Sequence, residues 1–255
     1  MLKYEGADLD FSLKGKTAII TGGAAGIGYA AAKFFHDKGV NLVLADMNPK
    51  VEEVSKSLGN NCVGVCGNIC DADFPGKVVE AGVKAFGRID ILINNAGASA
   101  LDSAENISAD DWNKTINVNL SANFFMAQAV GKYMIDNSAG GCIVNVASQA
   151  GVIALDKHVA YCASKGGVIS MTQVLALEWG KYGIRVNAVS PTVVLTEMGR
   201  MAWDNPVGDA VKKEMPSGRF AETDEIAACI AFLCTKGAAM ITGENLIIDG
   251  GYTIK

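Results

Sequence analysis

The sequence predicts a single doubly wound α/β domain, with a mostly parallel seven-stranded sheet and helices on both faces. Short apolar runs alternate with helix-length stretches from one end to the other, and most of these runs are apolar throughout. Strands of that kind are typical of a parallel sheet that is buried on both faces. The stretches between them are long enough for the crossovers that join parallel strands. No linker or repeat divides the chain, so we expect one domain over residues 1–255.

Seven segments fit the strands of this sheet. In chain order they are residues 16–22, 41–46, 62–69, 89–97, 141–148, 184–191 and 245–251. Helix-length segments such as GIGYAAAKFFHDKG separate them, and we expect two long helices over residues 110–136 and 160–182.

Two segments stand outside the alternation. Residues 196–220 (TEMGRMAWDNPVGDAVKKEMPSGRF) follow the sixth strand, are rich in Met, Trp, Pro and Gly, and lack a clean period. We expect them to form a substrate-covering insertion over the carboxyl edge of the sheet, where ligands bind in such folds. A plain surface excursion is the alternative. Residues 1–12 are expected to be an N-terminal extension.

Composition and charge exclude several functional classes. The chain is 50% hydrophobic and 19% charged, with a net charge of -5 and no basic run. We therefore expect neither a nucleic acid nor a membrane as partner. No apolar run approaches the roughly 18 residues that span a bilayer, and the N-terminus is too polar for a signal peptide. The expected location is the cytoplasm.

The seven cysteines fit that location. Their number is odd, and most lie in apolar surroundings, where cysteine behaves as a small hydrophobic residue. Cys62, Cys66 and Cys70 have a C-x3-C-x3-C spacing that matches no common zinc pattern and has no histidine nearby. We expect no metal site.

A glycine-rich turn follows the first strand. Gly22, Gly26 and Gly28 lie between that strand and a helix, where glycine permits a tight turn and close approach to a pyrophosphate. Asp46 ends the second strand, which places a carboxylate to bind ribose hydroxyls and to repel a 2′-phosphate. Neither Ala25 nor Met47 supplies a compensating positive charge. These features predict a Rossmann-type fold that binds NAD rather than NADP.

Four further motifs follow in order. They are NNAG at 94–97, Asn119 in NVNL, Ser148 in NVAS, and Tyr161 with Lys165 in YCASK. With TGGAAGIG they resemble the short-chain dehydrogenase/reductase family, from about residue 13 to the C-terminus. The resemblance implies that Asn119, Ser148, Tyr161 and Lys165 are the catalytic residues.

The chemistry of these side chains agrees with that assignment. Oxidation of an alcohol needs a base for the hydroxyl proton, and a free tyrosine, with a pKa near 10, is a poor base at neutral pH. Lys165 lies four residues after Tyr161, on the same helix face, so its ammonium is expected to lower the pKa of Tyr161. Ser148 offers a hydroxyl for the substrate oxygen, or caps a turn. In the family, the asparagine holds a water for proton relay.

Cofactor contacts come from the resemblance. It implies contacts at Gly22, Gly26, Ile27, Gly28, Asp46, Asn68, Ile69, Asn95, Ala96, Gly97, Tyr161, Lys165, Pro191, Val194 and Thr196. The chain departs from the family at two of these positions. Pro191 is followed by Thr192 where the family usually has glycine, and Asn68 stands where an aspartate commonly meets the adenine.

The substrate site is also inferred by resemblance. The segments VSPTVVLTEMGRMAWDNP and DKHVAYCASKGG resemble those of dicarbonyl/L-xylulose reductases and polyol dehydrogenases. This implies substrate contacts at Ser148, Gln149, His158, Tyr161, Thr192 and Trp203. His158 is otherwise an exposed loop residue, and Trp203 otherwise anchors the covering segment.

These inferences predict an NAD-dependent oxidoreductase that interconverts a secondary alcohol and a ketone, with a sugar alcohol and its ketose as the small-molecule pair. One alternative is a 3-oxoacyl carrier-protein reductase that uses NADPH, and another is an NAD-binding regulator without activity. The resemblance further implies a homotetramer built through the two long helices, with the apolar segment 244–255 as a second interface. Some relatives bind a metal at the C-terminus, but nothing in this sequence demands one.

Overall fold

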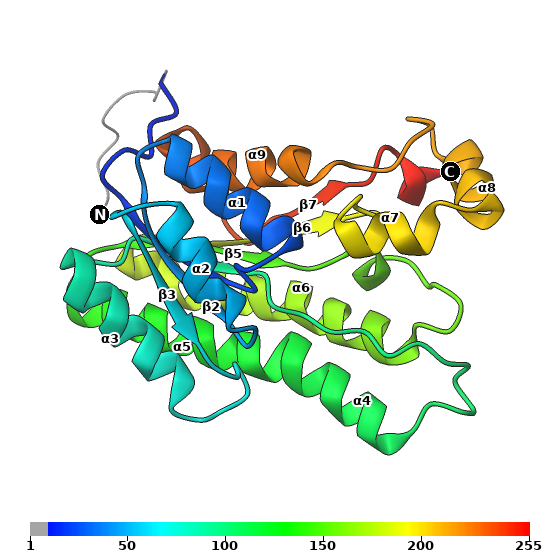
Figure 1. Cartoon of the computed structure of the whole chain (residues 1–255), viewed down its shortest axis with the longest axis horizontal. Coiled ribbons are helices and arrows are strands. Elements are labelled where there is room, and N and C mark those ends of the chain that lie inside the picture. Colours follow the sequence, from blue (N-terminus) through cyan, green and yellow to red (C-terminus); the bar gives the residue numbers. More distant parts are fainter. Residues whose placement is uncertain (1–9) are drawn as a thin grey trace.

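Seven parallel strands form the sheet of the computed structural model, which describes residues 10–255 (Figure 1). They are β1 Thr17–Thr21, β2 Asn41–Asp46, β3 Cys62–Cys66, β4 Ile91–Asn94, β5 Gly141–Val146, β6 Ile184–Pro191 and β7 Asn245–Ile248. Their order across the sheet is β3-β2-β1-β4-β5-β6-β7. The strand order reverses between β1 and β4, and in such sheets ligands bind at the carboxyl ends beside the reversal.

Helices cover both faces of the sheet (Figure 1). One face carries α1 Gly26–Asp37, α2 Lys50–Ser57 and α9 Thr223–Cys234, and the other carries α3 Phe74–Phe86, α5 Ala122–Asp136 and α6 Val159–Trp179. Helix α4 (Ala109–Ile116) leads into α5, while α7 (Glu197–Trp203) and α8 (Pro206–Glu214) follow β6. Short helical turns occupy Gln149–Gly151, Gly180–Tyr182, Lys236–Ala238 and Tyr252–Ile254.

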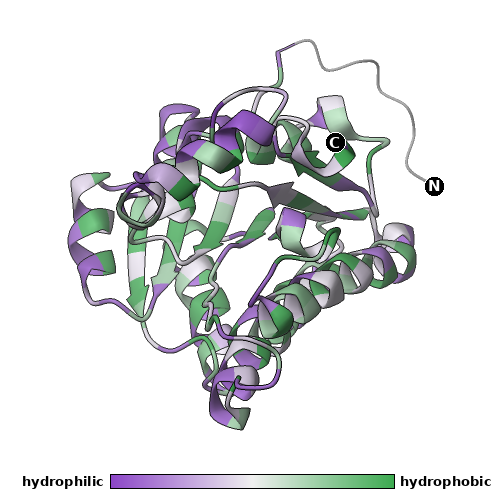
Figure 2. Ribbon diagram, turned by 90° about the vertical axis from the view of Figure 1, so that its right-hand side faces the viewer, coloured by the Kyte–Doolittle hydropathy of each residue, from purple (hydrophilic) through white to green (hydrophobic). Residues whose placement is uncertain are grey.

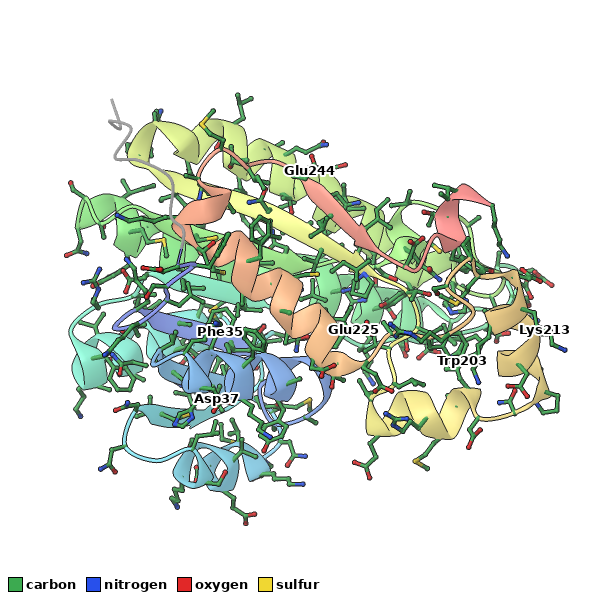
Figure 3. All side chains as sticks on the ribbon, turned by 90° about the horizontal axis from the view of Figure 1, so that it is seen from above. Phe35, Asp37, Trp203, Lys213, Glu225 and Glu244 are labelled. Carbon is green, nitrogen blue, oxygen red and sulfur yellow. The ribbon has the colours of Figure 1, made fainter. Side chains whose placement is uncertain are left out.

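Each face of the sheet has its own hydrophobic core because successive strand residues point to opposite sides. In β1, Ile20 packs with α1 and α9, while Ile19 packs with α3, α5 and α6. Phe35, labelled in Figure 3, is fully buried in the first core, and Met126 is fully buried in the second. Figure 2 shows the hydropathy of this arrangement, with largely hydrophobic strands and hydrophilic residues on the outer helix faces.

The predicted fold class is confirmed, and the sheet is parallel at every pairing among the described residues. Several predicted strands were too long at their carboxyl ends, because the polar residues there turn out of the ladder toward the ligand edge. The segment β4, for example, ends at Asn94 rather than at residue 97. The long helix expected over 110–136 was wrong in one detail, because a π-helical turn, η1 (Asn117–Ser121), separates α4 from α5.

The two exceptional segments differ in outcome. Residues 196–220 contain α7 and α8, so the segment is more regular than its sequence indicates. Of the expected N-terminal extension, residues 1–9 lie outside the described part of the chain. No helix within residues 10–255 is long and apolar enough to cross a membrane.

Candidate active site

The turn between β1 and α1 requires glycine, because of its backbone angles and because two backbone segments approach each other closely there. Gly22 and Gly26 have φ of 66° and 56°, which L-residues with a side chain rarely adopt. A Cβ on Gly28 would lie 2.1 Å from the carbonyl oxygen of Gly22. The loop therefore folds back on the first turn of α1 and leaves its backbone open to a ligand.

The N-terminus of α1 is free of acidic side chains. Ala25 is its N-cap and offers no side-chain oxygen, and the first turn contains no carboxylate. Helices α7 and α9 begin beside the same cleft, but α7 has the Thr196 hydroxyl as a cap and α9 has the carboxylate of Glu222. The first N–H groups of α1 thus remain available, and such a terminus attracts an anion, as a pyrophosphate is.

A cleft of about 1440 Å³ opens at this edge of the sheet. It is lined by the glycine turn, one side of α1 along its whole length, part of α2, the segment after β4 and the starts of α7 and α9. The predicted cofactor residues in its lining are Gly22, Gly26, Ile27, Asn95, Ala96, Gly97 and Thr196. The volume and the position at the strand reversal fit a dinucleotide.

Asp46 is not in the cleft lining, but two backbone donors fix its carboxylate, and one of them belongs to Ala24 of the lining. Its Oδ2 accepts a hydrogen bond from Ala24 N at 3.0 Å, and its Oδ1 accepts one from Asn48 N at 2.9 Å. The carboxylate therefore has a set direction while each oxygen keeps acceptor capacity for a ribose hydroxyl. Lys33 and Lys50 line the cleft and bring positive charge to it. The prediction of NAD from the sequence considered only Ala25 and Met47 as possible sources of such charge.

The NNAG segment ties β4 to β1. The hydroxyl oxygen of Thr21 accepts hydrogen bonds from Asn95 N at 2.9 Å and from Ala96 N at 3.0 Å. The amide Nδ2 of Asn95 donates to Thr21 O at 3.0 Å. These contacts hold residues 95–97 against the glycine turn, which gives the cleft a rigid floor.

Tyr161, Ser148 and Lys165 meet beside this floor. Tyr161 and Lys165 lie on α6, and Ser148 follows β5 and forms a side-chain hydrogen bond with Tyr161. Lys165 Nζ lies 5.7 Å from the centre of the Tyr161 ring and donates to Val146 O at 2.7 Å. A Cβ on Gly97 would lie 3.7 Å from Lys165 Nζ, so the lysine reaches the cleft residues.

Burial controls the ionisation of this pair. Desolvation raises the pKa of Tyr161, and the hydrogen bond from Ser148 opposes that rise. Desolvation also lowers the pKa of Lys165 to about 8. The expected net lowering of the Tyr161 pKa was wrong, because removal of the phenol from water raises that pKa and Ser148, not Lys165, is the group that opposes the rise.

Asn119 lies in the π-helical turn with its side chain fully engaged. Its Oδ1 accepts a hydrogen bond from Ala98 N at 2.7 Å, and its Nδ2 donates to Ala98 O at 2.8 Å and to Ser164 Oγ at 3.0 Å. Ser164 Oγ in turn donates to Tyr161 O at 2.8 Å. The side chain thus links the cleft floor to the helix of Tyr161, while the backbone carbonyl of Asn119 accepts a hydrogen bond from Asn123 Nδ2 at 2.7 Å.

His158 stands at the start of α6, close to Tyr161. Its ring centre lies 6.2 Å from that of Tyr161, and its Nδ1 lies 2.5 Å from the carbonyl oxygen of Asp156. Because a carbonyl oxygen only accepts, this contact assigns the proton of a neutral ring to Nδ1 and leaves Nε2 as an acceptor.

Gln149 and Thr192 present buried polar atoms without partners. Their side chains are 6% and 8% exposed. Within residues 10–255, neither Gln149 Oε1 nor Thr192 Oγ1 has a hydrogen-bond partner. Buried polar groups of this kind are rare in folded proteins and are explained by a ligand, a water or a functional role.

Trp203 packs on the protein itself. Its ring lies edge-on to Phe220 with centres 5.7 Å apart, and Figure 3 labels it at the end of α7. Arg200 of the same helix pairs with Glu222 at 2.6 Å, which ties α7 to the start of α9. These contacts favour the anchoring role for Trp203, and its contact with substrate stays a prediction.

The remaining predicted cofactor residues lie at strand ends outside the cleft lining. Asn68 and Ile69 follow β3, and Asn68 Oδ1 accepts a hydrogen bond from Cys70 N at 3.0 Å. Pro191 ends β6, and Val194 follows it in a short bridge with Ala221. Nothing in the described chain, residues 10–255, gathers three or more His, Cys, Asp or Glu side chains as a metal site would.

Sequence reasoning missed the buried polar residues behind the site. Ser164 and Asn123 are 0% and 1% exposed, and both bind Asn119. The available signal was their spacing, since Asn123 lies four residues after Asn119 and Ser164 directly precedes Lys165. Such spacing is common among unrelated helical residues and alone indicates little.

Comparison with known proteins agrees with this geometry. Residues 22–253 match a family described as enoyl-(acyl carrier protein) reductase. The chain is 52% identical to the D-threitol dehydrogenase of Mycolicibacterium smegmatis, over 97% of this chain and 96% of the relative. It is 49% identical to the NAD-dependent glycerol dehydrogenase of Listeria innocua, over the full length of both. A crystal structure of a short chain dehydrogenase from Bacillus anthracis superposes with a TM-score of 0.88 at 34% identity, covering 96% of this chain and 99% of that one.

Proposed function

Because the chain belongs to the short-chain dehydrogenase/reductase family, we propose that it is an NAD-dependent enzyme that interconverts a sugar alcohol and its ketose. One observation carries the proposal. Tyr161, Ser148 and Lys165 lie together, buried, beside a cleft at which helix α1 begins without a side-chain cap. The names of the threitol and glycerol dehydrogenases support the substrate class.

The cleft residues fit a dinucleotide. Gly22 and Gly28 leave backbone where a Cβ would clash, and the uncapped start of α1 suits the pyrophosphate. The fixed carboxylate of Asp46 suits the ribose hydroxyls of NAD and repels the extra phosphate of NADP. When bound, the oxidised nicotinamide accepts the hydride from the alcohol carbon.

The proton of the alcohol goes to Tyr161 in this account. Ser148 holds the substrate oxygen and donates to it as negative charge develops there. Lys165 lies within 5.7 Å of the Tyr161 ring centre, and its positive charge favours the phenolate that takes the proton. The backbone carbonyl of Asn119 holds the water through which Tyr161 returns that proton to solvent.

Three hydrogen-bonding atoms support a substrate with several hydroxyls. Nε2 of His158 accepts, as the Asp156 contact of Nδ1 requires. Gln149 Oε1 and Thr192 Oγ1 are buried without protein partners in the described chain. A polyol offers a donor for each of them, and an unpaired buried polar group strongly disfavours analogues that lack its partner.

A 3-oxoacyl carrier-protein reductase that uses NADPH is the second candidate. The description of the matching family and the presence of Lys33 and Lys50 in the cleft favour it. Asp46 opposes it, because a carboxylate held by two N–H groups does not turn away from a 2′-phosphate.

The substitution Tyr161→Phe tests the proposed chemistry. It removes the hydroxyl that takes the proton, and we expect polyol oxidation to fall at least about 100-fold. Binding of NAD, measured by calorimetry, should stay within about twofold of the wild type because α1 and Asp46 are untouched.

The control is Tyr133→Phe, which removes a phenol from α5 that is not in the cleft lining. It should turn over like the wild type. Full turnover by Tyr161→Phe would remove Tyr161 from the mechanism. A wild type that binds NAD but oxidises no alcohol would instead favour a regulator.

A further inference from the structure

Asn123 lies in the first turn of α5, directly behind Asn119, and it is 1% exposed. Its Nδ2 donates to Asn119 O at 2.7 Å and to Ala96 O at 3.3 Å. Its backbone carbonyl accepts a hydrogen bond from Asn94 Nδ2 at 3.0 Å. The residue thus touches the cleft floor, the end of β4 and the one group of Asn119 that its side-chain contacts leave open.

The orientation of the Asn123 amide is set by its neighbours. Both groups that face Nδ2 are carbonyl oxygens, which only accept hydrogen bonds. The opposite orientation would set an amide oxygen against two oxygens, so the nitrogen must face Asn119.

This orientation has a cost. Asn123 Oδ1 is buried and has no hydrogen-bond partner among residues 10–255. An apolar side chain of similar size would avoid that cost, but it would leave Ala96 O and Asn119 O without this donor. The amide at this position is therefore accounted for by the two carbonyl groups that it serves, and Asn119 O is the one that belongs to the proposed site.

The Asn119 carbonyl lies in a part of the helix where regular bonding is interrupted. In the π-helical turn, Ala122 N donates to Asn117 O, five residues back rather than four. Such turns alter the hydrogen bonding of carbonyls and occur often at functional sites. The Asn123 amide occupies one acceptor position of Asn119 O, and a carbonyl oxygen has two such positions.

We propose that Asn123 is a positioning residue for the proton relay. This inference rests on the proposed function. In oxidation the O–H bond of the alcohol breaks and its proton joins the Tyr161 phenolate, while the hydride with its two electrons passes to the oxidised nicotinamide. The proton then leaves Tyr161 through a water that donates to Asn119 O, and it ends in solvent. Asn123 holds that carbonyl in the direction that receives the water.

The substitutions Asn123→Thr and Asn123→Val make a matched pair for the test. Threonine and valine have the same shape, but a helical threonine donates to the carbonyl four residues back, which is Asn119 O. Thr172 shows this bond in the same protein, with Oγ1 donating to Val168 O at 2.8 Å. The pair therefore separates hydrogen-bond donation from packing.

The measurements are kcat and its solvent deuterium isotope effect in NAD-dependent polyol oxidation, with NAD affinity and thermal unfolding on the same samples. We expect Asn123→Val to lower kcat about five- to tenfold, the size of one lost hydrogen bond, and to raise the isotope effect. Asn123→Thr should stay within about threefold of the wild type. Both variants should keep KM and NAD affinity.

Three outcomes overturn the proposal. If Asn123→Val kept the kcat and the isotope effect of the wild type, the hydrogen bond from Asn123 to Asn119 O would have no part in the proton relay. Equal losses in Asn123→Val and Asn123→Thr, whether in kcat or in melting temperature, would assign Asn123 to packing. Tyr161→Phe is assayed alongside these variants. If Tyr161→Phe is inactive and Asn123→Val gives one of the two results above, only the Asn123 proposal fails. If Tyr161→Phe is active, the proposed function fails and this inference fails with it.

Discussion

At the level of single residues, the proposed reaction depends in both directions on the ionisation of Tyr161 and Lys165. Burial raises the pKa of Tyr161 and lowers that of Lys165 to about 8. Reduction of a ketose needs a proton on Tyr161 and a positive charge on Lys165, and oxidation needs the Tyr161 phenolate. The two directions should therefore respond to pH with opposite signs.

Initial rates between pH 6 and pH 10 test this response. As pH rises through about 8, Lys165 loses its proton and the rate of ketose reduction should fall. The rate of polyol oxidation should rise only at higher pH, toward the raised pKa of Tyr161, because the charge that favours the phenolate is lost above about 8. In Lys165→Arg the positive charge persists throughout this range. The rate of any residual ketose reduction should therefore no longer fall near pH 8. Flat profiles in both directions would contradict the assignment.

The sequence predicted which residues carry the proposed chemistry, and that assignment stays a prediction; their surroundings could not be predicted. The motif order gave Asn119, Ser148, Tyr161 and Lys165. It did not show that the Asn119 side chain is consumed by Ala98 and Ser164, because those contacts join residues 21 and 45 positions apart. The pKa of Tyr161 was misjudged for the same reason, since burial depends on the whole fold.

At the level of helices and strands, the start of α1 is the feature on which the proposed binding of NAD depends most. Ala25 provides no cap, although aspartate there would stabilise the helix. We predict that Ala25→Asp raises the melting temperature by a few degrees, equivalent to about 1 kcal/mol, and weakens NAD binding about tenfold. The new carboxylate would take the N–H groups of α1 and repel the pyrophosphate.

Ala25→Ser is the matched control for charge. Serine also caps a helix but carries no charge, so it should stabilise the protein with a smaller loss of affinity. Unfolding scans and calorimetric titration with NAD measure both effects. NAD affinity that is equal in Ala25→Asp and the wild type would show that the pyrophosphate does not bind at α1.

The π-helical turn is the element that sequence reasoning did not anticipate. Residues 110–136 show an uninterrupted helical pattern, and nothing in NVNLS differs in propensity from its neighbours. The turn is instead accompanied by contacts from other elements, such as Ala98 to Asn119 and Ser164 to Asn119. By contrast, the glycine turn was predictable because its geometry demands one residue type.

At the scale of the whole molecule, the outer faces of α5 and α6 expose large apolar side chains. Phe125 is 54% exposed, Val174 52% and Leu177 84%. We propose that these faces bury one another between subunits of a homotetramer, as exposed apolar surfaces do at interfaces. The variant Phe125→Lys with Leu177→Lys should then form smaller assemblies.

Light scattering after size-exclusion chromatography measures the change in assembly. Met201 on α7 is 82% exposed but lies outside these faces, so Met201→Lys is the control and should keep the wild-type mass. A monomeric wild type, or unchanged mass in the double variant, would contradict the proposed interface.

The sheet itself was the most predictable feature of the molecule. The seven apolar runs, interrupted by helix-length segments, allow little besides a parallel doubly wound sheet. The two helices within 196–220 were not predicted, because the segment is short in regular pattern and rich in Pro and Gly, and both helices pack on Phe220, α7 through Trp203 and α8 through Lys212.

The central claim is that this site moves hydride between a polyol and NAD. The most direct measurement is kcat/KM for polyols from glycerol to the hexitols and for their ketoses, each with NAD(H) and NADP(H). With the Asp46 carboxylate fixed by Asn48 and by Ala24 of the cleft lining, the account predicts turnover of at least one polyol with a preference for NAD of about tenfold or more. Reduction of an acyl-thioester ketone with NADPH, together with inactivity toward every polyol offered with NAD, would contradict it.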